Sequence, residues 1–280
     1  KQLTSIRPPI ASLKQSYEEL LSTFAHYRGA KLWFPFLGSG FGNGALVELA
    51  DGSVKYDFIG GIGVHYWGHN HPDLISSGVD AAISDTIMQG NLQQNTDSME
   101  LSSLLINASK LDHCFLTSSG AMANENALKI AFQKHYPANR ILAFERCFVG
   151  RTLATSQITD KAIYREGLPT NISVDYLPYF DPKFPEESTK AAVNALKKYI
   201  HRYPKGHAIM CFEFVQGEGG FHHGTSESFK AIMHILKENN IAIFADEVQT
   251  FGRLPELFAF QYYGLQEFVD IASIGKLSQV

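Results

Sequence analysis

Two residues near the end of the chain could act together in one reaction. Lys276 follows an apolar stretch and stands 30 residues after Asp246, which ends the apolar run of residues 241–245. A lysine amine can condense with an aldehyde, and a carboxylate can keep a ring nitrogen protonated. These are the two protein groups that pyridoxal 5'-phosphate (PLP) chemistry needs, so the pair predicts a PLP site. Without further support, such a pair is more often a strand-end carboxylate and a solvated amine.

A second group of residues could bind a phosphate. Ser119, Gly120 and Ala121 close a predicted strand and open a predicted helix. The first backbone N–H groups of a helix have no intrahelical acceptor, and the helix dipole is positive at that end. Gly120 permits close backbone approach and the Ser119 hydroxyl can add a donor, which suits a phosphate. Judged alone, the segment also fits a helix that is simply capped by serine.

Several segments, in this order along the chain, resemble the class III (ω-amine) aminotransferases of fold type I. They are TSSGAMANENALK at 117–129, FVGRT at 148–152, EFVQGEGG at 213–220 and ADEVQT at 245–250, followed by Lys276. The resemblance runs from about Leu46 to the last residue, and the combination is far more specific than any one segment. It implies an α/β large domain with a mainly parallel sheet flanked by helices, preceded by an N-terminal segment. It also implies a C-terminal small domain that this sequence does not contain.

The resemblance implies roles for the lysine, the aspartate and the phosphate segment. Lys276 would bond to the cofactor aldehyde and then move a proton as general base and acid, which requires a lowered pKa. Asp246 would pair with the protonated ring nitrogen of PLP. Ser119, Gly120 and Ala121 would hold its phosphate.

Other residues would surround the cofactor ring by the same resemblance. Val248 would press on one face of the ring, Phe148 would stack on the opposite face, and Gln249 would hydrogen-bond the phenolic oxygen. The family usually has His between the aromatic residue and Gly-Arg-Thr, whereas this chain has Val149. The stacking is therefore expected to remain, and any contribution of that histidine is absent.

Two glutamates are expected at the edge of the site. Glu218 occupies the position that in related ω-aminotransferases pairs with a C-terminal arginine and gates which end of a substrate binds. Glu213 is followed by Phe214, where the family usually has Pro. The resemblance assigns Glu213 only an indirect role behind the residues that contact the cofactor.

These implications favour a PLP-dependent aminotransferase. The enzyme would move an amino group from an ω-amino or diamino acid, of the lysine, ornithine, acetylornithine or 4-aminobutyrate type, to a 2-oxo acid such as 2-oxoglutarate. An aminomutase, a decarboxylating aminotransferase and a non-catalytic homologue of the same fold stay open as alternatives. A nicotinamide-binding oxidoreductase would need a strand-loop-helix glycine motif. The glycine-rich residues 38–44 instead lead into a predicted hairpin.

Composition narrows the class of protein. The chain has 280 residues, a net charge of −4 and 45% hydrophobic residues, with no block of like charges, so no nucleic-acid or membrane partner is expected. Cys114, Cys147 and Cys211 fall within predicted strands without metal spacing, and we interpret them as reduced core residues. His69 and His71 lack a third ligand in the sequence, so no metal site is expected. With no apolar run of membrane-spanning length and no signal peptide, a cytoplasmic location is expected.

The chain divides into two predicted parts. Residues 1–72 would form a helix at 14–27, a hairpin over residues 45–58 and an interface segment, and residues 73–280 would form the PLP-binding large domain. From residue 112, short apolar strands alternate with amphipathic helices, which predicts a mainly parallel sheet with ligands at the carboxyl ends of its strands. The expected strands are residues 113–117, 140–144, 174–177, 207–214, 241–245 and 269–273, and the expected helices are residues 122–135, 187–201 and 226–239.

A homodimer is the expected assembly. The segment around residues 33–72 is rich in large aromatic residues and has few charges, a composition suited to a buried interface. These aromatic residues include Trp33, Phe34, Phe36, Phe41, Tyr66 and Trp67. These aromatic residues could also cover the core of their own chain.

Overall fold

A computed structural model describes residues 3–85 and 92–278. The chain folds into two compact units, residues 1–87 and residues 88–280. Helix α3 (Pro72–Ile83) falls in the first unit, whereas the sequence-based division after residue 72 assigned it to the second.

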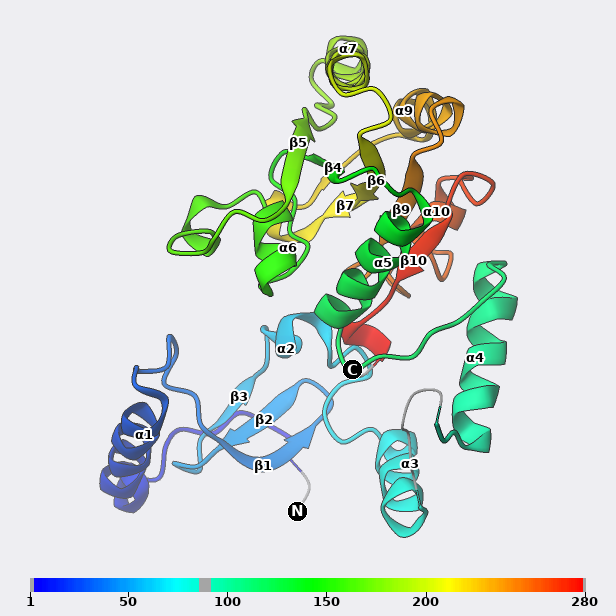
Figure 1. The fold of residues 1–280 in the computed structure, drawn as a ribbon. Coiled ribbons are helices and arrows are strands. Elements are labelled where there is room, and N and C mark those ends of the chain that lie inside the picture. The colour runs from blue at the N-terminus through cyan, green and yellow to red at the C-terminus, as the bar shows by residue number, and fades with distance from the viewer. Residues whose placement is uncertain (1–2, 86–91, 279–280) are drawn as a thin grey trace. The chain divides into compact units, whose positions relative to one another are not determined.

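The first unit contains a three-stranded antiparallel sheet and several helices (Figure 1). Strands β1 (Gly38–Asn43), β2 (Leu46–Leu49) and β3 (Val54–Tyr56) pair in that order. Helix α1 (Lys14–Arg28) follows the short η1 (Ala11–Leu13), and α2 (Gly60–Gly63) precedes α3. The predicted helix and hairpin are confirmed. The glycine-rich residues 38–44 form β1 and its turn into β2, which is a hairpin and not a strand-to-helix loop.

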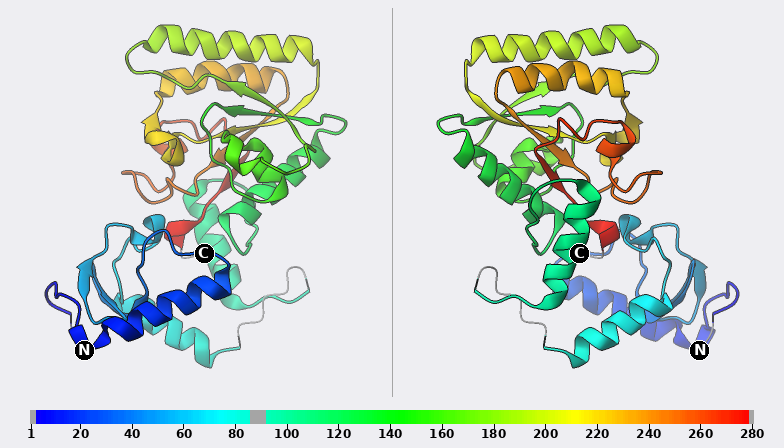
Figure 2. Two further views of the ribbon diagram at one scale, coloured as in Figure 1. Left: turned by 90° about the vertical axis from the view of Figure 1, so that its left-hand side faces the viewer. Right: turned by 90° about the vertical axis from the view of Figure 1, so that its right-hand side faces the viewer.

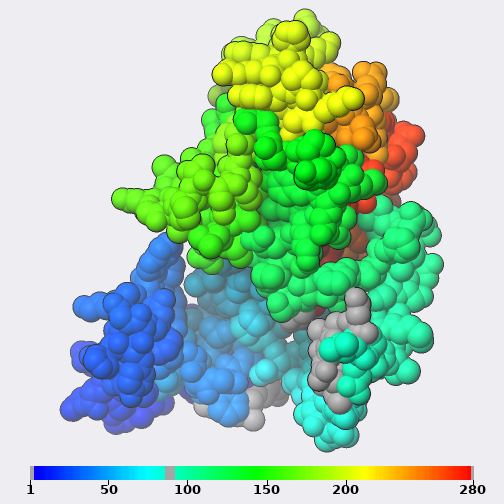
Figure 3. Space-filling model, in the orientation of Figure 1, coloured from blue at the N-terminus to red at the C-terminus, as the bar shows by residue number. Residues whose placement is uncertain are grey.

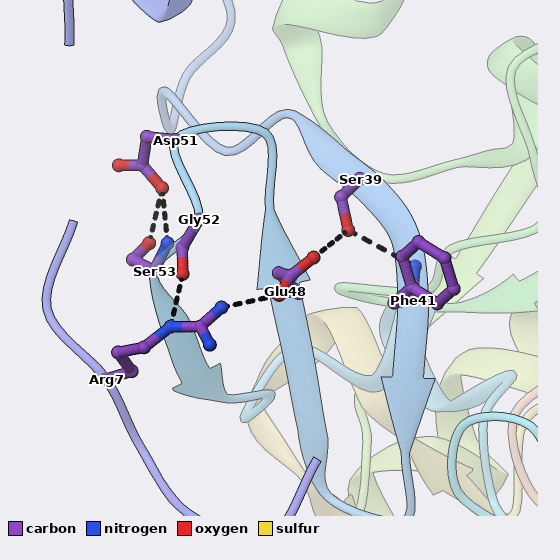
Figure 4. Close-up of polar contacts among 7 residues, drawn as sticks. All are labelled: Arg7, Ser39, Phe41, Glu48, Asp51, Gly52 and Ser53. Atoms are coloured by element: carbon purple, nitrogen blue, oxygen red, sulfur yellow. Dashed lines mark hydrogen bonds and ion pairs between the residues drawn. The ribbon is translucent and has the colours of Figure 1, made fainter. Parts of the chain in front are cut away.

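Charged residues fasten the N-terminal residues to this sheet (Figure 4). Arg7 donates from Nη2 to Glu48 Oε2 at 2.6 Å and from Nε to the carbonyl of Gly52 at 2.8 Å. The Ser39 hydroxyl donates to the other oxygen of Glu48 at 3.0 Å. Glu48 is only 4% exposed, and these donors from outside β2 account for a carboxylate at that depth.

His69 belongs to the same antiparallel structure. Its backbone pairs with Gly44, and its Nε2 lies 2.7 Å from Asp57 Oδ2, so a carboxylate does stand beside this histidine. The described residues contain no group of three His, Cys, Asp or Glu side chains arranged to hold a metal ion. Nor does any helix among them have the length and apolarity to cross a bilayer.

The second unit is built on a five-stranded parallel sheet, as the sequence predicts (Figures 1 and 2). Its strand order is β10-β9-β6-β4-β5. The strands are β4 (Arg140–Phe144), β5 (Ser173–Leu177), β6 (His207–Phe212), β9 (Ala242–Asp246) and β10 (Ile271–Ser273). The α-helices are α4 (Thr96–Ser109), α5 (Gly120–Lys134), α6 (Leu153–Ile158), α7 (Pro185–Arg202), α8 (Gly217–Gly220), α9 (Ser226–Glu238) and α10 (Ala259–Tyr262). The unit also contains the short helices η2 (Ala162–Tyr164) and η3 (Lys276–Ser278), and a small pair of strands, β7 (Val215–Gln216) and β8 (His222–His223).

Alternating side chains give this sheet two apolar faces. Leu142 and Phe144 of β4 pack in one cluster with Leu196 of α7 and Met233 of α9. Ile141, one residue earlier on the strand, packs on the other face in the cluster that α5 joins. The period of two along each strand therefore requires a helix layer on both sides. Figure 2 shows α7 and α9 side by side on one face, and Figure 3 shows them at the surface of this unit.

A polar cluster joins three strands near the amino end of β4. Arg140 donates to both carboxylate oxygens of Asp175, at 2.8 and 2.9 Å, and its guanidinium lies 3.8 Å from the centre of the Tyr203 ring. His207 Nε2 lies 2.8 Å from the same carboxylate. Burial raises the pKa of Asp175, but the hydrogen bonds from Arg140 and His207 outweigh it and leave that pKa below its ordinary value.

One predicted strand is wrong. Residues 113–117 form no strand, and Phe115 is 62% exposed, because this apolar stretch finds no ladder partner among the described residues. Cys114 consequently lies outside any strand, Cys147 lies in the loop after β4, and of the three only Cys211 lies within a strand. All three cysteines are free thiols. The other expected strands and helices are present, with ends that differ by a few residues.

The strand order identifies where a ligand should bind. From β4 the chain crosses to β5 on one side, and after α7 it returns to β6 on the other side of β4. The connections leaving β4 and β6 thus diverge, and such a switch point leaves a crevice at the carboxyl ends of the strands.

Candidate active site

A cavity of about 360 Å³ lies at this switch point. Its walls come from the N-terminus of α5, the loop after β4, the ends of β6 and β9, and the start of η3. The lining residues are Gly120, Ala121, Asn124, Phe148, Val149, Gly150, Arg151, Thr152, Glu213, Asp246, Val248, Gln249 and Lys276. Most of the residues expected from the sequence line one cavity in the second unit.

Asp246 is the last residue of β9 and is only 5% exposed. Its Oδ1 accepts from the backbone N–H of Val248 at 3.2 Å, and its Oδ2 accepts from the side-chain amide of Asn124 at 2.8 Å. Burial raises its pKa from the ordinary 3.8 to about 7, although both donors and nearby Lys276 act in the opposite direction. The site therefore holds a carboxylate whose charge the protein only partly compensates.

Lys276 follows β10, the strand that pairs with β9, and the ladder places Ser273 opposite Asp246. Lys276 is in the left-handed region, with φ 53°, and begins η3. Burial lowers the pKa of its amine, while the negative charges of Asp246 and Glu218 act to raise it. A lowered pKa makes the neutral amine more available as a nucleophile or a base.

The N-terminus of α5 presents free backbone donors. The Ser119 hydroxyl accepts from the N–H of Met122 at 3.2 Å and so caps the helix. The preceding N–H groups, those of Gly120 and Ala121, have no acceptor among the described residues. A Cβ at Gly120 would lie 2.8 Å from both methyl groups of Val248, so only glycine lets this backbone approach so closely.

The loop after β4 is held from two sides. The backbone N–H of Phe148 donates to Glu213 Oε2 at 2.8 Å. The N–H groups of Val149 and Gly150 donate to the hydroxyl of Thr159 at 3.0 and 3.3 Å. Burial, reinforced by the charge of Asp246, raises the pKa of Glu213 well above its ordinary value. Glu213 thus positions the aromatic residue that the sequence placed against the cofactor ring.

Two expected site residues are not among those that line the cavity. Ser119 acts as the cap just described. Glu218 lies on α8, where its Oε2 is 3.5 Å from Lys161 Nζ. The charge of Glu218 still acts on the pKa values of Lys276 and Glu213, so it stands near the cavity. Its expected gating role stays a prediction.

Sequence reasoning assigned no site role to five residues of the lining. Four of them, Val149, Gly150, Arg151 and Thr152, belong to the FVGRT segment and could have been found there. The Thr152 hydroxyl donates to Glu125 on α5, which ties this loop to the helix. Asn124 gave no signal, because an amide within a helical sequence is indistinguishable from a surface residue.

The charges of the site fit PLP. Asp246 and Glu213 are buried acids in the lining, where Lys276 and Arg151 are the basic residues. Asp246 lacks a full counter-charge, and a protonated ring nitrogen would supply it. The free N–H groups of α5 suit a phosphate in the same cavity. Both ends of the cofactor therefore find matching groups.

Comparison with known proteins agrees with this geometry. The model of the aminotransferase class-III family matches residues 39–278. An acetylornithine aminotransferase from Methanocaldococcus jannaschii is 34% identical over 244 residues, and one from Bradyrhizobium diazoefficiens is 34% identical over 247 residues. The matches cover 84% and 86% of this chain but 56% and 57% of those proteins. This chain therefore spans just over half the length of these relatives.

Solved structures share the fold. An (S)-enantioselective ω-transaminase from Thermomicrobium roseum is similar with a TM-score of 0.81 and 27% identity, covering 93% of this chain and 63% of that one. Lysine aminotransferase from M. tuberculosis is similar with a TM-score of 0.80 at 21% identity, covering 92% of this chain and 66% of that one. The match to the family model, which spans most of the chain, shows that the chain belongs to the class III aminotransferase family.

Proposed function

We propose that this protein is a PLP-dependent aminotransferase acting on an ω-amino or diamino acid. The observation that carries the proposal is that Lys276 and Asp246 line one cavity with the free N–H groups at the start of α5. When bound, PLP supplies an aldehyde that takes up amino groups and a ring that withdraws electrons. A non-catalytic homologue would need none of these groups in one place.

The cofactor would be held at both ends and on both faces. The backbone of Gly120 and Ala121, with Ser119 beside them, would bind the phosphate, and Asp246 would accept the ring N–H. Val248 packs against Gly120 and would cover one face of the ring. Phe148, held by Glu213, would cover the other. Gln249 lines the cavity and would donate to the phenolic oxygen.

Lys276 would perform the proton transfers. Its amine is partly buried, which lowers its pKa and favours the neutral base. That base would take the proton from the substrate carbon that bears the amino group. It would then give that proton to the aldehyde carbon of PLP, after which water would release the donor skeleton as a carbonyl compound and its nitrogen would stay with the cofactor.

Charged residues around the cavity support amino-acid substrates. Arg151 lines the cavity and is the side chain suited to a substrate carboxylate, because its planar guanidinium can bind both oxygens. Glu218, close enough to act on Lys276, would set which end of the substrate enters. We propose a donor of the acetylornithine, ornithine, lysine or 4-aminobutyrate type and a 2-oxo acid such as 2-oxoglutarate as acceptor. The acetylornithine aminotransferases among the relatives favour the first of these donors.

Borohydride trapping tests the cofactor site. The full-length protein, incubated with PLP and reduced, should carry the cofactor on Lys276, as read by peptide mass spectrometry. Lys129, on α5 but not among the lining residues, serves as the internal control and should stay unlabelled. Label on another lysine would contradict the assignment.

A screen of the four donors separates the alternatives. An aminotransferase consumes the donor only when a 2-oxo acid is present. An aminomutase isomerises the donor without an acceptor, and a decarboxylating aminotransferase releases carbon dioxide from it. A homologue without catalytic function would leave every donor unchanged.

We further propose that the protein is a homodimer and that it is located in the cytoplasm, as expected from the sequence.

A further inference from the structure

Asn124 joins two parts of the cavity that are far apart in the sequence. It lies on α5 and is 2% exposed. Its Nδ2 donates to Asp246 Oδ2 at 2.8 Å and to the carbonyl oxygen of Val149 at 2.7 Å. One amide group thus ties the acid at the end of β9 to the loop that follows β4.

The orientation of this amide follows from its partners. A carbonyl oxygen and a carboxylate oxygen both accept hydrogen bonds, so only the NH₂ group can face them. Its Oδ1 then has no hydrogen-bond partner within the described part of the chain. A buried acceptor without a donor destabilises a fold. Packing alone would therefore favour an apolar residue at this position.

We propose that Asn124 is a positioning residue for Asp246, fixing the carboxylate in the orientation that receives the ring N–H of PLP. The inference rests on the proposed function. Val248 N–H holds one carboxylate oxygen and Asn124 holds the other, so the group cannot rotate. A carboxylate has about four acceptor positions, and these two donors leave positions open toward the cavity.

A positioning role for Asn124 can be distinguished from a packing role, because only the effect of a positioning residue should depend on the ring nitrogen of PLP. The probes are PLP and an analogue in which carbon replaces that nitrogen. The analogue keeps the phosphate, the aldehyde and the ring shape, so it offers Asp246 no N–H. The ratio of the two dissociation constants therefore measures what Asp246 contributes.

The experiment compares this ratio in variants of the full-length protein, by calorimetry or fluorescence quenching. The unaltered protein should bind PLP more tightly than the analogue. Asn124→Ala should reduce that preference about tenfold or more, the loss expected when a buried charge loses one of its two donors. Asn124→Leu, which is similar in size but has no donor, should do the same. In an Asp246→Ala background, removing Asn124 should change the ratio no further.

Asn126→Ala is the matched control. Asn126 lies on the same helix, and among the described residues its side-chain amide donates only to the carbonyl of Met122 within that helix. Its replacement should leave the ratio unchanged. Equal weakening of both probes by Asn124→Ala and Asn124→Leu would overturn the inference, since it would indicate packing alone. An unaltered protein that binds neither probe would instead overturn the proposed function.

Discussion

Replacing Asp246 with Asn should change how the stability of the cofactor-free protein depends on pH. The folded state raises the pKa of Asp246 from 3.8 to about 7, so it binds the proton more tightly than the unfolded chain does. Stability from this group is therefore present at low pH and is lost as pH rises through 7. Between pH 5 and pH 8, linkage gives a loss of roughly 2–3 kcal/mol. Asp246→Asn has no proton to lose and should not show this loss.

Hydrogen exchange of the β9 amides is the appropriate assay. Trp33 and Trp67 both lie in the first unit, so tryptophan fluorescence reports on the wrong part of the chain. The protection of β9 in the unaltered protein should fall by roughly 30- to 150-fold from pH 5 to pH 8, relative to Asp246→Asn, after correction for intrinsic exchange. Saturating PLP should remove the difference. A relative change below about threefold, or greater protection at pH 8, would refute the reasoning.

Three further outcomes are expected. Gly120→Ala should weaken PLP binding about tenfold or more, because its Cβ would lie 2.8 Å from the methyl groups of Val248. The control Gly78→Ala on α3, where nothing lies within 4 Å of the new Cβ, should stabilise the protein by roughly 0.5–1 kcal/mol. Equal PLP affinity for the two variants would contradict the steric role of Gly120. Asp246→Ala should bind some PLP but react on the order of a thousandfold more slowly, and a loss under tenfold in a single-turnover assay would speak against its role. The full-length protein should sediment as a two-fold homodimer at micromolar concentration, with an interface above about 2,000 Å² in total, and a fully active monomer would exclude it.

The sequence predicted which residues line the cavity better than which residues support them. Lys276 and Asp246 could be found because an amine and a carboxylate at strand ends have few other uses that also fit the neighbouring segments. Asn124 could not, because its importance lies in contacts with two residues that are distant along the chain. A hydrogen bond across the fold leaves no local pattern.

The strands show the same division between local and distant information. Residues 140–144 form β4 as predicted, since their apolar run is buried between two neighbouring strands. Residues 113–117 have a similar run but form no strand. Apolar content and length are local properties, whereas a ladder partner is not. The glycine-rich residues 38–44 illustrate the converse, because their pairing with β2 gives a strand to a sequence of low strand propensity.

The parallel sheet carries two buried carboxylates that differ in where their counter-charges come from. Asp175 receives two hydrogen bonds from Arg140 and contacts His207, so its partners belong to the same chain. The charge of Asp246 is only partly compensated by Asn124, the Val248 N–H and Lys276. Under the proposed function, the protonated ring nitrogen of PLP would supply the missing counter-charge. We therefore expect unfolding of the cofactor-free form to begin at the carboxyl ends of β9 and β10, near Asp246. The hydrogen bonds that join Arg140, Asp175 and His207 should persist longer.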